Sequence, residues 1–210
     1  IASLADQYAG GEIVVTHRQN LVFPTVRVDA LQALWRALGD IGLEAGNVGK
    51  LGDIIACPGL DYCALANARS IPLAQEISTR FADLRRQHNI GPLTLNISGC
   101  INACGHHHVG NIGILGVDKR GEEYYQISLG GASDNDTAIG AILGAALSGA
   151  QITDAIETVV QTYLDIRTAA DETFVDTVRR TGLDPFQRAV YGGPAAATGL
   201  AADPAQEIAA

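Results

Sequence analysis

The four cysteines of this chain lie in two short pairs, and their spacing constrains the protein more than any other feature. Five residues separate Cys57 from Cys63, and three residues separate Cys100 from Cys104. A helix-sized insert of 36 residues lies between the two pairs. Proline and glycines flank the thiols, and glycines let a backbone approach a ligand closely. The pattern predicts two loops that bring four thiols to a common inorganic centre.

Other interpretations of the cysteines are open. Four cysteines allow three disulfide pairings, but a chain of 210 residues has a core that needs no such staples. Free cysteines that serve only as small apolar side chains would not be confined to two loops. A structural zinc site usually has about two to four residues between paired ligands, so the gap between Cys57 and Cys63 is wide for zinc. Zinc remains the inorganic alternative to a cluster.

Three consecutive histidines, His106, His107 and His108, follow the second cysteine pair directly. Consecutive side chains cannot all face one ion, so we do not expect these histidines to be metal ligands. Histidine titrates near pH ~6.5 and can supply protons. We expect either a pocket lining for an anionic or macrocyclic ligand, or a solvated loop.

Residues 1–56 are expected to form a half-domain. Apolar spacing and turn residues predict a helix over 1–9, strands over 12–16 and 21–23, a helix over 29–39 and a strand over 53–56. Asp29 is the expected cap of the second helix, whose core-facing residues are Leu31, Leu34, Trp35 and Leu38. The order matches a ferredoxin-like unit without its first strand. Since the chain also lacks methionine, we expect it to begin within a longer protein.

Residues 57–191 are expected to form an α+β domain around the cysteines. A short helix could start at Ala64, and a longer one runs from Pro72 to about Asn89. The remaining expected elements are a strand over 93–97, a hairpin over 111–129, a strand or buried helix over 138–147, helices over 152–166 and 171–181, and a last turn over 184–190. Residues 192–210 are rich in Gly, Pro and Ala, which predicts a disordered tail.

The composition argues against several kinds of partner. A formal net charge of −9 disfavours binding to nucleic acid through a basic surface. No apolar run reaches the ~18 residues of a membrane span. The N-terminus also lacks the basic flank and apolar core of a signal peptide. We expect a cytoplasmic protein with no nucleic-acid or membrane partner.

The cysteine spacing, followed by the strand 112–116 and the turn Leu129-Gly-Gly131, resembles the signature of the sirohaem-dependent sulfite and nitrite reductases. The similarity extends to three further stretches: 17–21, 172–174 and 186–191. It therefore covers nearly everything except the tail. The fold that it implies is α+β, with a truncated ferredoxin-like half-domain followed by an iron–sulfur and sirohaem-binding domain.

The resemblance implies a 4Fe–4S cluster held by Cys57, Cys63, Cys100 and Cys104, together with a sirohaem. In that family the last cysteine also bridges to the sirohaem iron as its axial ligand, which here would be Cys104. Asn102 matches a position that helps to hold the sirohaem. The resemblance assigns no catalytic residue within this chain.

The implied activity is that of the C-terminal part of an assimilatory sulfite reductase, which reduces sulfite to sulfide with six electrons at sirohaem coupled to the cluster. Nitrite reduction to ammonia is the alternative within the family, and a non-catalytic iron–sulfur or zinc module is the alternative outside it. Sulfite is preferred to nitrite as the expected substrate because residues 105–119 are similar to those of bacterial sulfite-reducing members.

The resemblance also implies partners: the sulfite or nitrite anion, a ferredoxin or flavoprotein electron donor, and the N-terminal half of the same protein. In the family that half carries the arginines and lysines that clamp the anion and the sirohaem carboxylates. Here Arg69 is the basic residue near the cysteines. We therefore expect this chain alone to be inactive.

Overall fold

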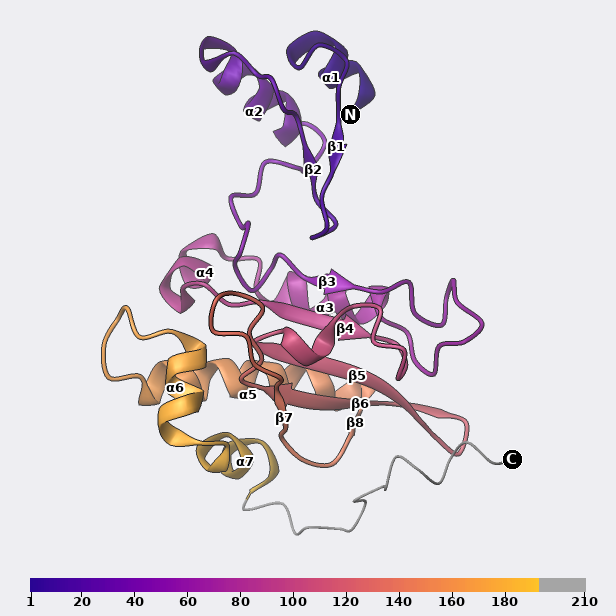
Figure 1. The fold of residues 1–210 in the computed structure, drawn as a ribbon, viewed down its shortest axis with the longest axis vertical. Helices are drawn as coiled ribbons and strands as arrows, with labels where there is room; N and C mark the ends of the chain where they lie inside the picture. Colours follow the sequence, from indigo (N-terminus) through magenta and orange to yellow (C-terminus); the bar gives the residue numbers. More distant parts are fainter. Residues whose placement is uncertain (193–210) are drawn as a thin grey trace.

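The computed structural model describes residues 1–192, which form a small N-terminal unit and a larger body of helices and sheet (Figure 1). The expected α+β class is confirmed. The predicted disordered tail lies, apart from Gly192, outside the described residues. Within the described residues, no helix has both the length and the apolar character that crossing a membrane requires.

The N-terminal unit consists of a two-stranded ribbon and two helices. Its elements are α1 (Ala2–Tyr8), β1 (Val14–Val15), β2 (Leu21–Val22), the 3-10 turn η1 (Val28–Ala30) and α2 (Leu31–Gly39). The strands are antiparallel, with Val14 opposite Val22. Element order and type over residues 1–39 match the expectation from the sequence.

Two expectations for α2 are wrong. Asp29 does not cap the helix, because α2 starts after Ala30 and the Asp29 carboxylate accepts a hydrogen bond from Arg27 at 2.8 Å. Of the four residues expected to face a core, only Leu34 is buried, while Leu31 is 50% and Trp35 is 55% exposed. A two-stranded ribbon is too narrow to cover a full helix face.

The larger body is built on a mixed six-stranded sheet in the order β3-β4-β5-β6-β7, with β8 also paired to β6. Its strands are β3 (Ile55–Ala56), β4 (Leu95–Ser98), β5 (Ile112–Lys119), β6 (Glu122–Leu129), β7 (Ala141–Ile142) and β8 (Leu147–Ser148). The first three strands are parallel to one another, and β6 runs antiparallel to its neighbours.

The expected hairpin is confirmed as β5 and β6. Its two-residue turn is Arg120-Gly121, with φ values of 59° and 84°. Positive φ at both central residues is the geometry that joins twisted antiparallel strands most readily. The stretch 138–147, which fitted either a strand or a helix, contains β7 and the start of β8.

One strand belongs to a different sheet than expected. Residues 53–56 were predicted to complete the ferredoxin-like unit, but Ile55 and Ala56 pair with Asn96 and Ile97 of β4. The central sheet offers β3 a buried parallel neighbour, whereas the strands of the N-terminal ribbon are exposed. The domain boundary at residue 56 stays a prediction.

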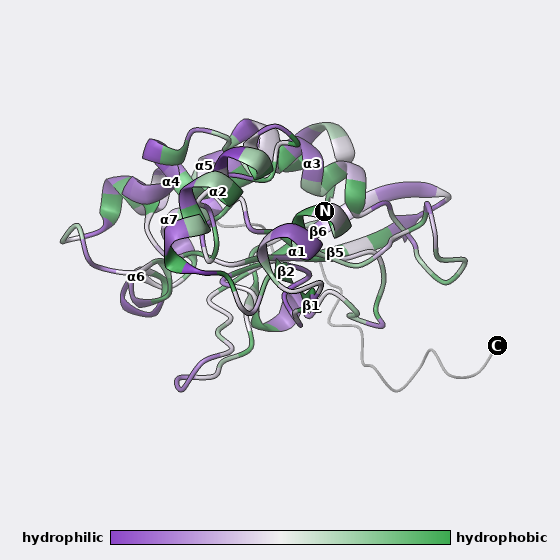
Figure 2. Ribbon diagram, turned by 90° about the horizontal axis from the view of Figure 1, so that it is seen from above, coloured by the Kyte–Doolittle hydropathy of each residue, from purple (hydrophilic) through white to green (hydrophobic). Residues whose placement is uncertain are grey.

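The helices of the larger body are α3 (Ile71–Arg80), α4 (Leu84–Ile90), α5 (Gly149–Ile166), α6 (Phe174–Thr181) and α7 (Asp184–Tyr191). Both α6 and α7 pack against α5. Figure 2 shows α3, α4 and α5 together on one side of the strands. The helix expected over 72–89 is two helices, because Asp83 caps a new start with bonds from the Arg85 and Arg86 backbone. The segment after Ala64 forms turns and no helix.

The core lies between these helices and the strands. The α5 residues expected to face inward are all buried: Ile152, Ile156, Val159, Val160 and Tyr163. They belong to one apolar cluster with strand residues such as Ile97, Ile114 and Ile127. The core therefore rigidifies the parallel strands whose ends carry the cysteines.

The buried hydroxyl of Tyr163 gives a first prediction. It lies 3.1 Å from the carbonyl of Ile90 and 2.7 Å from that of Glu172, and the residue is 1% exposed. Tyr163→Phe is expected to lower the free energy of unfolding by about 1–3 kcal/mol, because buried carbonyls lose their donor. Urea unfolding measures the change. Tyr62→Phe, at a tyrosine that is 79% exposed, should stay within about 0.5 kcal/mol.

Candidate metal centre

The two cysteine pairs follow two neighbouring parallel strands. Cys57 comes directly after β3, and Cys100 comes two residues after the end of β4. Because β3 and β4 are adjacent and parallel, both loops leave the sheet at the same end, where the two strands terminate. Crevices at the carboxyl ends of parallel strands are common ligand sites. The topology thus brings together two loops whose cysteines are about forty residues apart in sequence.

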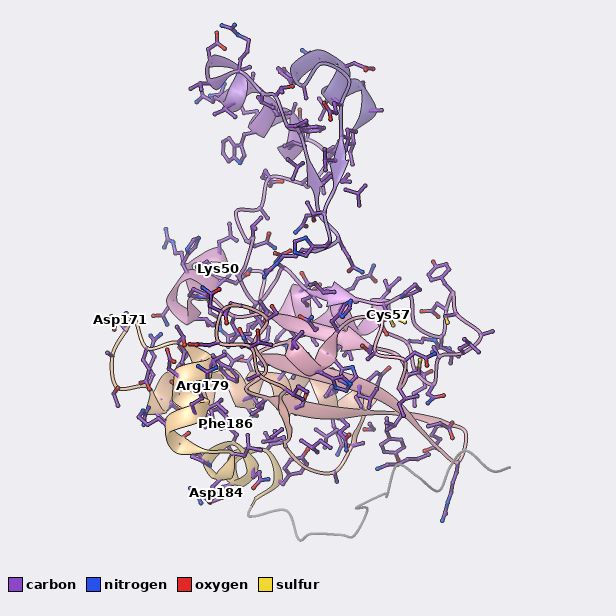
Figure 3. All side chains as sticks on the ribbon, in the orientation of Figure 1. Lys50, Cys57, Asp171, Arg179, Asp184 and Phe186 are labelled. Atoms are coloured by element: carbon purple, nitrogen blue, oxygen red, sulfur yellow. The ribbon has the colours of Figure 1, made fainter. Side chains whose placement is uncertain are left out.

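Hydrogen bonds join the two cysteine loops. The backbone N–H groups of Asn67 and Ala68 donate to the carbonyl of Gly99 at 2.8 and 3.0 Å. The Gly99 N–H donates to Cys57 Sγ at 3.0 Å, and Cys57 N–H donates to the carbonyl of Ile97 at 3.0 Å. Figure 3 labels Cys57 beyond the end of β3. Its thiol therefore lies against the residue that precedes Cys100.

The four cysteines are free thiols that differ in exposure. Cys57 and Cys100 are buried, Cys63 is half-buried and Cys104 is exposed. The Cys104 thiol lies 3.9 Å from the carbonyl of Asn102, which is itself exposed. Within residues 1–192, no three Cys, His, Asp or Glu side chains are gathered closely enough to hold a metal ion.

The donor set fits a four-thiolate cluster in chemistry and in loop placement. Thiolates are the ligands of iron–sulfur clusters, and one backbone N–H already faces a sulfur atom. The four thiols must come closer together than they are among the described residues before they can share one centre. Such closure is common where metal binding and local folding are coupled. The ligand set of Cys57, Cys63, Cys100 and Cys104 stays a prediction.

The glycines beside the cysteines serve two purposes. The Gly99 N–H faces a sulfur atom, as expected for a glycine beside a ligand, whereas Gly59 and Gly105 leave room for the protein backbone. A Cβ at Gly59, whose φ is +67°, would lie 2.5 Å from the Ser70 nitrogen, and one at Gly105 would lie 2.0 Å from the Ile97 carbonyl oxygen. These glycines allow the loops to pack tightly on the sheet and on each other.

Backbone strain brackets the fourth cysteine. Ala103 and His106 have φ values of 55° and 54°, in the left-handed region that residues with a Cβ rarely adopt. Such strain is held by surrounding contacts and clusters at functional sites. Here the Asn96 side chain donates to the carbonyls of Gly105 and His106 at 3.0 and 3.2 Å, which holds the turn.

The three histidines do not act as a group. His106 helps to line a cavity of about 350 Å³ between the turn that joins β1 to β2 and the six-stranded sheet. His17 and Arg18, in that turn, also line this cavity. His107 begins the 3-10 turn η2 (His107–Val109) and is buried, and its Nδ1 has no hydrogen-bond partner among residues 1–192. His108 is exposed and its ring lies 3.9 Å from that of His107.

His107 gives a prediction for pH dependence. Burial, with a smaller contribution from His108, lowers the pKa of His107 from 6.5 to about 4. The unfolded chain therefore takes up this proton near its ordinary pKa of ~6.5, before the folded protein does. The free energy of unfolding should fall as pH drops from about 6.5 to about 4, by at most roughly 3 kcal/mol from this residue.

The measurement is urea unfolding across that range of pH. His107→Leu should flatten the profile between about pH 6.5 and 4, because the residue that titrates differently in the two states is gone. His88→Gln, at an exposed histidine of α4, is the matched control and should leave the slope unchanged. A parental profile with no fall in that window would contradict the prediction.

Arg69, the basic residue expected near the cysteines, is already paired. Its guanidinium lies 3.1 Å from Asp61 and 3.4 Å from Glu123. Its carbonyl accepts a hydrogen bond from the Tyr125 hydroxyl at 2.9 Å. Burial and the adjacent Glu123 raise the pKa of Tyr125, so the hydroxyl remains a donor. This network anchors the first cysteine loop, and Arg69 is not a free cation for a substrate.

Sequence reasoning missed the side chains that hold the site from outside. Ser70 Oγ lies 3.4 Å from Cys57 Sγ, and the Gln19 amide bonds to the backbone of Ala56. Gln19 and Asn20 belong to the stretch 17–21 that carried the resemblance, but no local pattern shows which residues they contact. Their partners are more than thirty residues away in sequence.

Two models of known protein families match this chain. The family model described as the nitrite and sulphite reductase 4Fe-4S domain matches residues 48–195, and that described as the nitrite/sulfite reductase ferredoxin-like half domain matches residues 1–41. The chain is 32% identical over 178 residues to a sulfite reductase (ferredoxin) 2 of Mycolicibacterium paratuberculosis, which covers 80% of this chain and 32% of that protein.

Two further relatives agree. The chloroplastic ferredoxin–nitrite reductase of Zea mays is 32% identical over 148 residues, covering 65% of this chain and 25% of that protein. The structure of the Mycobacterium tuberculosis NirA protein superimposes with a TM-score of 0.69 at 27% identity, covering 83% of this chain and 33% of that one. This chain thus spans about a third or less of these relatives. With the 4Fe-4S domain model matching well over half of its residues, the chain belongs to the nitrite and sulfite reductase family.

Proposed function

We propose that this chain is the cluster-holding part of an enzyme that reduces sulfite, with nitrite as the alternative substrate. The matched 4Fe-4S domain and the sulfite and nitrite reductase relatives imply a 4Fe–4S cluster and a sirohaem. When bound, the two groups supply single electrons and an iron site for the anion. Cys57, Cys63, Cys100 and Cys104 would hold the cluster.

The observation that carries the proposal is the bonded contact between the two cysteine loops. Cys57 Sγ accepts the Gly99 N–H at 3.0 Å, and the Gly99 carbonyl accepts two N–H groups from the first loop. An N–H donor aimed at sulfur stabilises negative charge on a thiolate. Cys57 is thus the thiol that the fold prepares best as a ligand.

The gradient of exposure supports a role for Cys104 at the outer side of the site. Cys57 and Cys100 are buried, whereas Cys104 and Asn102 lie at the surface. An exposed thiolate would be accessible to a macrocycle bound at the surface of the two loops. We therefore assign Cys104 to the sirohaem side and Asn102 to its support.

The two cysteine loops also carry apolar side chains that are between 41% and 81% exposed: Leu60, Tyr62, Leu65 and Ile101. Apolar groups gathered on one surface mark a place that another molecule covers. Their exposure on the loops that carry the cysteines suits the flat apolar face of a macrocycle.

We assign substrate reduction to a longer protein of which this chain would be one part. Arg69 is paired with two carboxylates, and the relatives are about three times as long as the matched segment. His17, Arg18 and His106 line one cavity, and the Arg18 guanidinium would favour an anion there. We expect the chain alone to bind cofactor but not to turn over, with a ferredoxin or flavoprotein donor serving the complete enzyme. Four free thiols suit a reducing compartment such as the cytoplasm.

Anaerobic reconstitution with iron and sulfide tests the proposal. We expect a brown protein with about four iron and four sulfide per chain, and a paramagnetic signal after reduction. Sirohaem added to this protein should give a Soret and a red band. A colourless protein that binds one zinc tightly would identify the zinc module instead. Assays of the full-length enzyme with sulfite and with nitrite decide between the substrates.

A further inference from the structure

We propose that Gln19 is a positioning residue for Cys57, acting through the backbone of Ala56. The inference rests on the proposed function, since it concerns how the first cluster ligand is held. Gln19 lies in the turn between β1 and β2 and is separated from Ala56 by 37 positions in sequence. The tip of this hairpin points towards β3 in Figure 1.

The contact is a double hydrogen bond. Gln19 Nε2 donates to the carbonyl of Ala56 at 2.8 Å, and the Ala56 N–H donates to Gln19 Oε1 at 3.0 Å. Ala56 ends β3, which is the edge strand of the six-stranded sheet. The side-chain amide thus pairs with the backbone N–H and C=O of one residue on the outer side of β3, as a neighbouring strand would. Ala56 directly precedes Cys57, so these hydrogen bonds fix the backbone at the residue where the first cysteine loop begins.

A second contact holds the other end of the same segment. Asn20 Nδ2 donates to Asp53 Oδ1 at 2.9 Å, and the other oxygen of Asp53 accepts the N–H of Gly49 at 2.9 Å. The hairpin tip therefore binds residues 53 and 56, on both sides of Ile55. Motion of the edge strand relative to the hairpin tip must break both contacts.

The backbone of Gln19 shows that this arrangement is held under strain. Its φ is +61°, in the left-handed region that a residue with a Cβ adopts at a cost. Glycine or asparagine would satisfy the turn with less strain. The long amide is required only for the reach to Ala56, so the turn alone does not explain this residue.

We call the double hydrogen bond between Gln19 and Ala56 the Gln19 clamp. The position of Cys57 depends on this clamp. On one side the Cys57 N–H is bonded to Ile97 of β4, and on the other side the clamp is the contact that holds the preceding residue. Short edge strands open locally at a free energy below that of global unfolding. Losing the clamp should therefore expose the Cys57 thiol more often, while the core stays folded.

The test measures cysteine alkylation in the metal-free chain. Iodoacetamide labelling followed by mass spectrometry of the peptides gives a rate for each thiol separately. Gln19→Ala is expected to speed alkylation of Cys57 by about three- to tenfold, as expected for losing a pair of partly exposed hydrogen bonds. Cys104 is already exposed, so its rate should not change and serves as an internal reference.

Two further variants separate the clamp from the turn. Gln19→Gly relieves the backbone strain at φ +61° but also removes the amide, so it should speed Cys57 alkylation as Gln19→Ala does. Gln7→Ala removes an exposed glutamine from α1 in the same unit and should leave every rate unchanged. A Gln19→Gly rate equal to the parent would assign Gln19 to the turn alone and overturn the inference.

The same variants can be followed after cluster reconstitution. Transfer of iron to a chelator should be about three- to tenfold faster from Gln19→Ala than from the parent. A parent chain that takes up no cluster contradicts the proposed function, while the alkylation rates still decide the clamp. Equal acceleration of the buried thiols Cys57 and Cys100 would indicate general unfolding, and it would overturn a selective role for Gln19.

Discussion

Cys57→Ser is expected to lower the iron bound after anaerobic reconstitution at least about tenfold, because an alkoxide forms far less readily than a thiolate and binds iron–sulfur clusters poorly. Serine keeps an oxygen that can accept the Gly99 N–H, as Cys57 Sγ does at 3.0 Å. The metal-free fold should therefore be retained, with a change in the free energy of unfolding of about 1 kcal/mol or less. Iron and sulfide analysis, with urea unfolding of the metal-free protein, measures both effects.

The control for this variant removes a neighbouring polar group and leaves all four thiols. Ser70 Oγ lies 3.4 Å from Cys57 Sγ, and the residue is fully buried. Ser70→Ala should keep the full iron content, because its hydroxyl is not a ligand. If Cys57→Ser bound as much iron as Ser70→Ala, Cys57 would not be a ligand and the four-thiolate site would be wrong.

Gly105→Ala is expected to have the largest effect on stability. The added Cβ would lie 2.0 Å from the carbonyl oxygen of Ile97, in the buried strand β4. A backbone oxygen in the centre of a sheet cannot turn aside, so the loop or the strand must move. We expect a loss of about 3 kcal/mol or more in the free energy of unfolding. The displacement should also move Cys104, the neighbouring residue.

Gly46→Ala is the matched control for that substitution. A Cβ at Gly46 meets no atom within 4 Å, and its φ is not in the left-handed region. Its free energy of unfolding should stay within about 0.5 kcal/mol of the parent. Urea unfolding of the metal-free chains compares the two. A Gly105→Ala variant as stable as Gly46→Ala would show that the second loop is not packed against β4 as described.

The elements that could be predicted are those set by local interactions. The apolar residues of α5 repeat at helical spacing and all five expected positions are buried. The hairpin of β5 and β6 follows from alternating apolar residues around Arg120-Gly121. Pro72 lies in the first turn of α3 as predicted. In each case the residues that determine the structure are neighbours along the chain.

Predictions that depended on distant partners were less accurate. Trp35 and Leu31 have the spacing of a core-facing stripe, yet they are exposed because the N-terminal unit has no surface wide enough to cover them. The helix expected from Pro72 to Asn89 divides in two, because Asp83 caps a second start. Periodicity describes one face of a helix and does not state what lies opposite that face.

Cysteine spacing alone determined that two loops would carry the thiols, and residue pattern determined most helices and the central hairpin. Only the tertiary structure placed β3 beside β4, paired Arg69 with two carboxylates and set the Gln19 amide against Ala56. The physical reason is that strand pairing and long-range side-chain contacts depend on segments that are distant in sequence. A strand of two residues, such as Ile55–Ala56, carries too little local information to choose its own sheet.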